Sequence, residues 1–219
     1  ENRLLLVIVP NLDEASKWLS LLQVYGWDKA LLYPSSEGSP YEYFDTTNEI
    51  IWGQLQVISE INNINSDSKL AIVATERALQ PHLPPCSELL SKCIKYKVGD
   101  NKDLENEGIL LTQLGYNKCN KVEQEGNWSR RGDIIDLYPV CNELPIRLEF
   151  FGNELEKIKE FDPISQRSLD SLKSITITPT GFTHLIAQKL REINDSNVKE
   201  IIGEEAYEEL TQGSTPLGI

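Results

Sequence analysis

The sequence predicts an α/β protein, in which a parallel sheet with helices is followed by an α+β domain that contains an antiparallel sheet. Apolar, strand-sized runs alternate with helical patterns over residues 1–93, and this alternation is typical of a parallel sheet covered by helices. Short β segments with brief connections follow over residues 94–178, which favours an antiparallel sheet. A length of 219 residues suits two such domains.

The first domain opens on a strand and a capped helix. Residues 3–10 form a continuous apolar run, which suits a strand covered on both faces. Asn11 is followed three residues later by Glu14, and this pair favours the start of a helix over residues 12–24. Gly26 predicts the end of that helix.

Two further strands and a second helix complete the first domain. Apolar runs over residues 29–33 and 70–74 predict strands, and the loop at residues 34–40 is rich in Ser, Gly and Pro. Between the strands, apolar residues recur at helical spacing over residues 47–61 and predict a helix. Thr75 is suited to cap a short helix after the last strand.

The second domain is expected beyond a proline-rich segment at residues 82–85. A strand is predicted over residues 93–98, and a helix over residues 103–114 that Gly115 ends. Five β segments follow, at residues 116–124, 127–138, 146–151, 155–161 and 174–178. The remainder, residues 182–219, has a helical pattern with loops and no sheet signal.

The formal net charge of −13 argues against nucleic acid as a partner of this chain. Non-specific affinity for DNA comes mainly from lysine and arginine side chains that displace counterions from the phosphates. Protein partners fit this acidity better.

The cysteines are scattered, which predicts reduced thiols in a cytoplasmic protein. They are Cys86, Cys93, Cys119 and Cys141, and the two histidines are His82 and His184. Zinc sites need clustered thiolates or imidazoles, so we expect no metal site. No apolar run approaches the roughly 20 residues that span a bilayer.

The sequence contains no recognisable catalytic constellation. No glycine stands in the phosphate-binding pattern GxxxxGK[ST], and no GxGxxG follows the first strand. The patterns GxSxG and HExxH are also absent. The many carboxylates, as at residues 203–209, have the spacing of a solvated helix face. We therefore expect neither catalytic residues nor a cofactor in this chain.

The most informative stretch is residues 126–152, which the pattern predicts to be a β-hairpin. One strand ends at Tyr138 and Pro139, a loop covers residues 142–145, and a second strand covers residues 146–151. Because side chains alternate along a strand, each strand presents one set to the core and another to the opposite side.

The second strand of this hairpin predicts the members of each set. Leu148 and Phe150 are expected to face the core. Arg147, Glu149 and Phe151 alternate with them and are expected to face the other way.

Folding the hairpin about its loop predicts which residues of the first strand join this outer set. Arg131 is expected opposite Phe151 and Gly152. Asp136 is expected near Arg147. Arg131, Arg147 and Phe151 are thus candidates for one shared surface.

Two interpretations of that surface are open. Exposed arginine beside an aromatic ring is typical of interface hot spots. Alternatively, Arg147 is held by Asp136 or Glu149 in a local ion pair and Phe151 is half covered, in which case the surface says little about function. Composition alone favours the second interpretation.

The same stretch resembles the shared module of the bacterial excision-repair proteins UvrB and Mfd. The first part of their common pattern stands here as Gly126, Trp128, Ser129, Arg131, Gly132, Ile134, Ile135, Asp136, Leu137, Tyr138 and Pro139. Its continuation stands as Arg147, Leu148, Glu149, Phe150, Phe151, Gly152, Asn153 and Glu154. A match this long with its internal spacing preserved is far more specific than a short motif.

Three features resemble the Mfd branch of that family rather than UvrB. Residues 161–168 match the FDPxxQRS stretch of Mfd. Residues 40–44 lead directly into a helix, without room for the aromatic hairpin with which UvrB grips damaged DNA. The stretch at residues 213–219 resembles the point where Mfd continues into its next segment.

The resemblance implies a fold and a domain arrangement. Residues 1–93 correspond to a degenerate RecA-like, helicase-like domain whose N-terminal part, with its decayed phosphate-binding loop, precedes this chain. Residues 94–178 correspond to a UvrA-interaction domain. Residues 179–219 correspond to a truncated segment that returns to the first domain.

The resemblance also implies a function, which is to recruit UvrA and so link a stalled RNA polymerase to nucleotide excision repair in the cytoplasm. The residues implicated are Arg131, Arg147 and Phe151. The parent protein is an ATP-dependent DNA translocase whose ATP, Mg, DNA and polymerase sites lie in absent domains, and its absent C-terminal domain can mask this surface.

Two alternatives come from other functional classes. A UvrB-like fragment that binds damaged DNA predicts a salt-dependent gel shift. An unrelated α/β enzyme that uses surface carboxylates predicts ATP turnover or metal dependence. The acidity of the chain and the missing hairpin argue against the first alternative.

Overall fold

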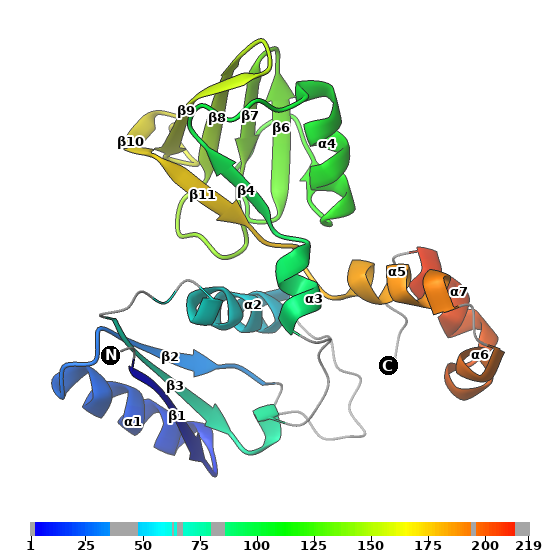
Figure 1. Ribbon diagram of the computed structural model, residues 1–219. Helices are drawn as coiled ribbons and strands as arrows, with labels where there is room; N and C mark the ends of the chain where they lie inside the picture. Colours follow the sequence, from blue (N-terminus) through cyan, green and yellow to red (C-terminus); the bar gives the residue numbers. More distant parts are fainter. Residues whose placement is uncertain are drawn as a thin grey trace. The chain divides into compact units, whose positions relative to one another are not determined.

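The computed structural model describes residues 3–35, 48–62, 64, 68–79, 86–193 and 196–212 (Figure 1). Its elements group into two units, residues 1–83 and residues 84–217. The α/β class predicted from the sequence is confirmed, because one unit holds a parallel sheet with helices and the other is built mainly on antiparallel strands.

The first unit is a parallel sheet with helix α1 on one face and helix α2 on the other (Figure 1). Its elements are β1 (Arg3–Val9), α1 (Leu12–Val24), β2 (Lys29–Tyr33), α2 (Asn48–Asn62), β3 (Lys69–Thr75) and the 3-10 helix η1 (Arg77–Leu79). The strand order is β1-β3-β2, and both pairings are parallel. The predicted parallel sheet is confirmed.

Local capping explains where these helices begin. The side chain of Asn11 accepts a hydrogen bond from the backbone N–H of Glu14 at 2.9 Å, so it satisfies one of the free donors in the first turn of α1. The hydroxyl of Thr75 accepts from the backbone N–H of Ala78 at 3.3 Å and caps η1. Both predicted caps are confirmed.

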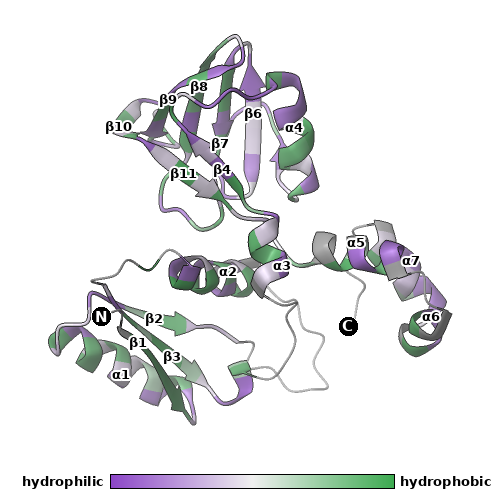
Figure 2. Cartoon of the chain, in the orientation of Figure 1, coloured by the Kyte–Doolittle hydropathy of each residue, from purple (hydrophilic) through white to green (hydrophobic). Residues whose placement is uncertain are grey.

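The two helices cover the sheet unequally. Helix α1 packs Ala15 and Leu22 against one face, and α2 packs Val57 against Leu70 and Ile72 on the other face. Strand β1 is apolar beyond its first residue, Arg3 (Figure 2). On the α2 side of β1, the side chains of Leu4, Leu6 and Ile8 are exposed. The prediction that this strand is covered on both faces is therefore wrong for the described residues, because α2 lies over β2 and β3 only.

The second unit contains the larger sheet. Its elements are α3 (Cys86–Ser91), β4 (Ile94–Lys97), α4 (Leu104–Gln113), β5 (Asn117–Lys118), β6 (Asn127–Arg131), β7 (Ile134–Leu137), β8 (Ile146–Phe151), β9 (Glu154–Phe161), β10 (Ser168–Leu172), β11 (Ser174–Ile177), α5 (Thr183–Ile193), α6 (Ser196–Ile202) and α7 (Glu204–Gln212). Six strands form a sheet of order β10-β9-β8-β7-β6-β5, and β11 pairs with β4 in a second sheet. All pairings are antiparallel except β5 with β6.

The structure corrects the predicted strand at residues 127–138. This stretch is a hairpin of β6 and β7 rather than one strand. The chain reverses at Gly132, whose φ of +61° lies in the left-handed region that glycine adopts most readily. The reversal changes which residues face one another across the sheet.

One other prediction for this sheet is wrong, and one of its strands was not predicted. Of the strand predicted at residues 116–124, only Asn117 and Lys118 pair, and the loop beyond them buries Val122. Strand β10 was not predicted, because its sequence is polar and its residues are largely exposed at the edge of the sheet.

Helix α4 packs on the apolar face of the six-stranded sheet. Its single glycine, Gly108, lies so close to Trp128 that an added Cβ would stand 2.6 Å from the indole ring. Glu105 of the same helix pairs with Arg130 of β6 at 2.8 Å. The buried carboxylate of Glu107 accepts a short hydrogen bond from the hydroxyl of Tyr96. The predicted helix over residues 103–114 is confirmed.

The described residues beyond β11 form the short helices α5, α6 and α7, in agreement with the predicted helical pattern. Leu190 of α5 packs with Tyr207 and Leu210 of α7 in a small apolar cluster. The guanidinium of Arg191 donates to the carbonyl oxygen of Thr211 in the last turn of α7, where a cation is favourable.

Some predictions lie outside the described residues. They concern the loop at residues 36–40, the direct entry into α2 at residues 40–44, the segment at residues 82–85 and the stretch at residues 213–219. Within the described part of the chain, no helix has the length and apolar character needed to cross a membrane.

Candidate partner-binding surface

The six-stranded sheet presents two faces of opposite character. Alternation buries an apolar set beneath α4 and its neighbours, namely Trp128, Ile135, Leu137, Ile146, Leu148, Phe150, Leu155 and Ile158. The opposite side, which we call the polar face, carries Ser129, Arg131, Ile134, Asp136, Arg147, Glu149, Phe151, Lys157 and Lys159. All three sequence-predicted site residues lie on the polar face.

The polar face is organised around one buried carboxylate. Asp136 is 1% exposed and stands in register with Arg147 on the neighbouring strand. Arg147 donates from Nε to Oδ1 of Asp136 at 2.6 Å and from Nη2 to Oδ2 at 3.0 Å. Arg131 donates from Nη2 to the same Oδ2 at 2.8 Å. One carboxylate therefore holds both arginines.

Arg147 is enclosed on several sides. Its guanidinium lies 4.8 Å from the centre of the Phe161 ring. Its Nη1 donates to the carbonyl oxygen of Gln166 at 3.4 Å. Only 14% of the side chain remains exposed. The hydrogen bond to Asp136 raises the pKa of Arg147, so its charge is permanent.

The turn that contains Gln166 lies beside this arginine and is held by hydrogen bonds of the Gln166 side chain. Gln166 is the only described residue other than glycine with a positive φ, at 61°. Its side-chain amide donates to the carbonyl oxygens of Pro163 at 2.6 Å and Val122 at 3.0 Å. The turn after β9 is thereby tied to the loop before β6 at the side of Arg147.

Arg131 and Phe151 are the exposed members of the predicted site. The Arg131 side chain is 61% exposed, and Phe151 is 76% exposed. Phe151 ends β8, where the backbone N–H of Phe150 donates to the carbonyl oxygen of Asp133 at 2.9 Å. The ring therefore stands beside the β6–β7 turn on the same face as Arg131.

The hairpin that carries Phe151 is also fixed from its far side. The backbone N–H of Lys102 donates to the carbonyl oxygen of Asn153 at 2.8 Å, and that of Leu155 donates to Asp100 at 2.9 Å. An exposed ring on a backbone held in this way loses little further freedom on binding.

The structure differs from the predicted register at one point. Asp136 faces Arg147 as expected, and Leu148 and Phe150 face the core. Arg131 pairs with Ile134, however, and not with the end of β8, because the chain turns back at residue 132. Phe151 is far more exposed than the half-covered ring of the ion-pair interpretation.

Sequence reasoning missed two features of the polar face. One is the shared role of Asp136, since an ion pair with Arg147 was among the interpretations but a second one with Arg131 was not. The other is Ile134, an exposed apolar residue between Arg131 and Glu149 in the register of the sheet. Gly132 followed by Asp133, between two strand-like runs, is a turn signal, and a turn at this point would have predicted both features.

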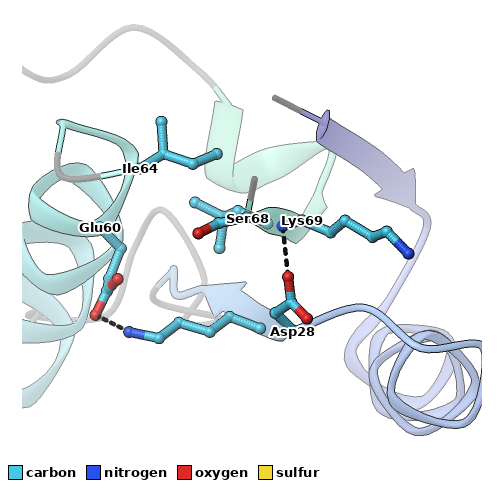
Figure 3. Close-up of a pocket in the computed structure, with 7 residues that line it drawn as sticks. Asp28, Glu60, Ile64, Ser68 and Lys69 are labelled. Carbon is cyan, nitrogen blue, oxygen red and sulfur yellow. Dashed lines mark hydrogen bonds and ion pairs between the residues drawn. The ribbon is translucent and has the colours of Figure 1, made fainter. Parts of the chain in front are cut away.

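The described residues show no cluster suited to binding a metal ion. They contain no group of three His, Cys, Asp or Glu side chains that is able to hold a metal ion. A pocket of about 350 Å³ lies at the start of β2 and β3, and Figure 3 shows the residues that line it. Its carboxylates are engaged within the protein, Glu60 with Lys29 at 2.6 Å and Asp28 with the backbone N–H of Lys69 at 2.8 Å.

Comparison with known families defines the class of the second unit. Residues 94–181 match the UvrB interaction domain family. The match runs from the first strand of this unit, β4, past its last strand, β11, and includes the whole polar face. The second unit thus contains a UvrB interaction domain.

The particular relatives are transcription-repair-coupling factors. The chain is 32% identical to that of Bacillus subtilis over 179 residues, 81% of this chain, and 29% identical to that of Haemophilus influenzae over 176 residues, 80% of this chain. It is 25% identical to that of Escherichia coli over 217 residues, 97% of this chain. The chain spans 15%, 15% and 19% of the length of these relatives. The matches are consistent with an N-terminal fragment of such a factor, so the resemblance found in the sequence is confirmed.

Proposed function

We propose that this chain is a non-catalytic docking module of a transcription-repair-coupling factor, and that its polar face binds UvrA. The observation that carries the proposal is the joint placement of Arg131, Arg147 and Phe151 on one side of a UvrB interaction domain. Arg131 and Phe151 are exposed. Arg147 is mostly buried and pairs with the carboxylate of Asp136, as Arg131 also does.

The chemistry of this face fits a protein partner. An exposed aromatic ring and an exposed arginine beside Ile134 give an apolar centre with charged neighbours, which is the usual composition of interface hot spots. The net charge of the chain is −13, which disfavours a nucleic-acid phosphate backbone.

The longer protein would use this docking step to connect a stalled RNA polymerase with excision repair. In this proposal, ATP and Mg act in a DNA-translocating motor outside this chain, and the cytoplasm is the site of action. An additional domain of the parent would mask the polar face until repair is required. The names of the relatives and the interaction domain support the coupling role.

A titration of purified UvrA against the chain tests the proposal. We expect Arg131→Ala and Phe151→Ala each to weaken binding about 30-fold, since truncating a hot-spot anchor costs about 2 kcal/mol or more. Circular dichroism and thermal melting would establish that each variant is folded.

Matched control variants test whether the loss of an exposed ring or cation elsewhere on the chain also weakens UvrA binding. Tyr25→Ala removes a ring that is 78% exposed at the C-cap of α1 in the other unit, and Lys95→Ala removes a cation exposed on β4. Both controls should bind UvrA like the wild type. Wild-type affinity in Arg131→Ala and Phe151→Ala would contradict the proposal.

The same preparations separate UvrA docking from the DNA-binding alternative. Damaged duplex DNA should give no salt-dependent gel shift with the chain alone. A shift whose affinity falls by orders of magnitude as salt rises would favour the UvrB-like alternative instead.

A further inference from the structure

The two arginines of the polar face play unequal parts around Asp136. Arg147 grips the carboxylate with two donors and is almost fully enclosed. Arg131 reaches the same carboxylate with Nη2 alone and extends into solvent. Among the described residues, no other group accepts a hydrogen bond from Arg131.

One nitrogen of the Arg131 guanidinium, Nη2, is bonded to Asp136, and the other two are not. Asp136 fixes Nη2 at a position set by the sheet, because Asp136 is itself held by strand pairing and by Arg147. Neither Nε nor Nη1 of Arg131 has a hydrogen-bond partner among the described residues, and Nη2 carries a second N–H that is parallel to the N–H of one of these two nitrogens. Two parallel donors of a guanidinium are complementary to a carboxylate, which they bind in a bidentate manner.

We infer that Asp136 is a positioning residue, which orients Arg131 to receive a carboxylate of UvrA, and that Arg147 acts by holding Asp136. This inference rests on the proposed docking function. An exposed arginine normally samples many rotamers, and a partner must then restrict it at a cost in affinity. Anchoring one donor inside the sheet removes most of that cost before the partner arrives.

The assignment predicts a specific pattern for Arg147. With 14% of its side chain exposed, Arg147 has little surface for a partner to contact. Its replacement weakens binding because Asp136, and through it Arg131, loses its position. The Asp136 carboxylate without Arg147 would be buried with only one partially exposed counter-charge.

The first experiment needs no UvrA. In the free chain labelled with ¹⁵N, the heteronuclear NOE of Arg131 Nε–H should be high in the wild type, which indicates restricted motion. In the double variant Asp136→Asn with Arg147→Gln, it should fall to the value of a mobile side chain. This variant removes both buried charges together, so neither is left uncompensated. Equal mobility of Arg131 in the two proteins would overturn the inference.

The second experiment is a double-mutant cycle of UvrA binding. Arg131→Ala should weaken binding about 30-fold in the wild type but less than about 3-fold in the background without the Asp136 carboxylate. A purely structural role of Asp136 would leave the effect of Arg131→Ala unchanged between backgrounds. An unchanged effect would therefore overturn the inference.

Arg131→Lys covers the case in which the double variant does not fold. Lysine keeps the exposed charge but has no planar fork. We expect a loss of more than about 10-fold in affinity, and wild-type affinity would overturn the inference. Absence of UvrA binding by the wild type would instead reject the docking function, while the NOE measurement still reports on Asp136.

Discussion

Asp136 makes the two arginines of the polar face differ in their importance for folding. Arg147 supplies two of the three hydrogen bonds from arginine to the carboxylate and lies on the Phe161 ring. Arg131 supplies the third from an exposed position. Removal of a partner from a buried ion pair costs far more than removal of one from an exposed pair.

We therefore expect Arg147→Ala to lower the free energy of unfolding by about 3 kcal/mol or more. Arg131→Ala should lower it by less than about 1 kcal/mol, because Arg147 still compensates Asp136. Urea unfolding followed by circular dichroism measures both. Equal losses in the two variants would show that Asp136 does not depend on Arg147.

The placement of the three candidate residues on one face was predictable, but the way they are joined was not. The resemblance pointed to Arg131, Arg147 and Phe151, and alternation along a strand placed Arg147 and Phe151 on one face. The shared carboxylate depends on the pairing of three strands. A pattern in sequence gives alternation within a strand but does not give the register between strands.

At the level of elements, turn chemistry explains why the strand predicted at residues 127–138 is two strands. Residues 127–138 read as one long strand because strand-forming residues flank Gly132 on both sides. The left-handed φ at that glycine splits the stretch into β6 and β7. Helices α1 and α4 were predicted to within a residue of their observed bounds because Asn11 and Asp103 both cap them.

Gly108 provides a test of how α4 is seated on the sheet. An alanine in a helix is normally more favourable than glycine by about 1 kcal/mol. Here the new Cβ would stand 2.6 Å from the rigid indole of Trp128, so helix and sheet must separate. We expect Gly108→Ala to destabilise the second unit by about 1–3 kcal/mol, as overpacked cores do.

The matched control is an exposed position on the same helix. Asn106→Ala changes helix propensity without approaching the sheet and should be neutral or slightly stabilising. Urea unfolding monitored by tryptophan fluorescence compares the two variants. Stabilisation by Gly108→Ala would mean that α4 is not held against Trp128.

At the level of the whole chain, alternation of strands and helices was sufficient to predict the α/β class and the parallel sheet. Strand order was not predictable, because nothing in the apolar runs distinguishes a central strand from an edge strand. Strand β3 is central and almost wholly buried, whereas β1 at the edge exposes every second residue. The edge strand β10 escaped prediction because it has little apolar character.

Two buried tyrosines predict how the stability of the second unit depends on pH. Burial raises the pKa of Tyr96, with a further contribution from its hydrogen bond to Glu107. Burial also raises the pKa of Tyr116, whose hydroxyl donates to the carbonyl oxygen of Thr178 at 2.9 Å. In the unfolded chain both phenols ionise near pH 10.

Because the folded state keeps these protons while the unfolded state loses them, the contribution of the two tyrosines to the free energy of unfolding should be constant below about pH 10 and should fall above it. Tyr116→Phe should lower stability at neutral pH by about 1 kcal/mol, the usual value of one hydrogen bond. It should also make the alkaline decline shallower, since one of the two buried phenols is gone. Resonances of ¹³C-labelled tyrosine, followed with circular dichroism through an alkaline titration, measure this directly. Ionisation of Tyr96 or Tyr116 while the fold remains intact would contradict their burial in the core.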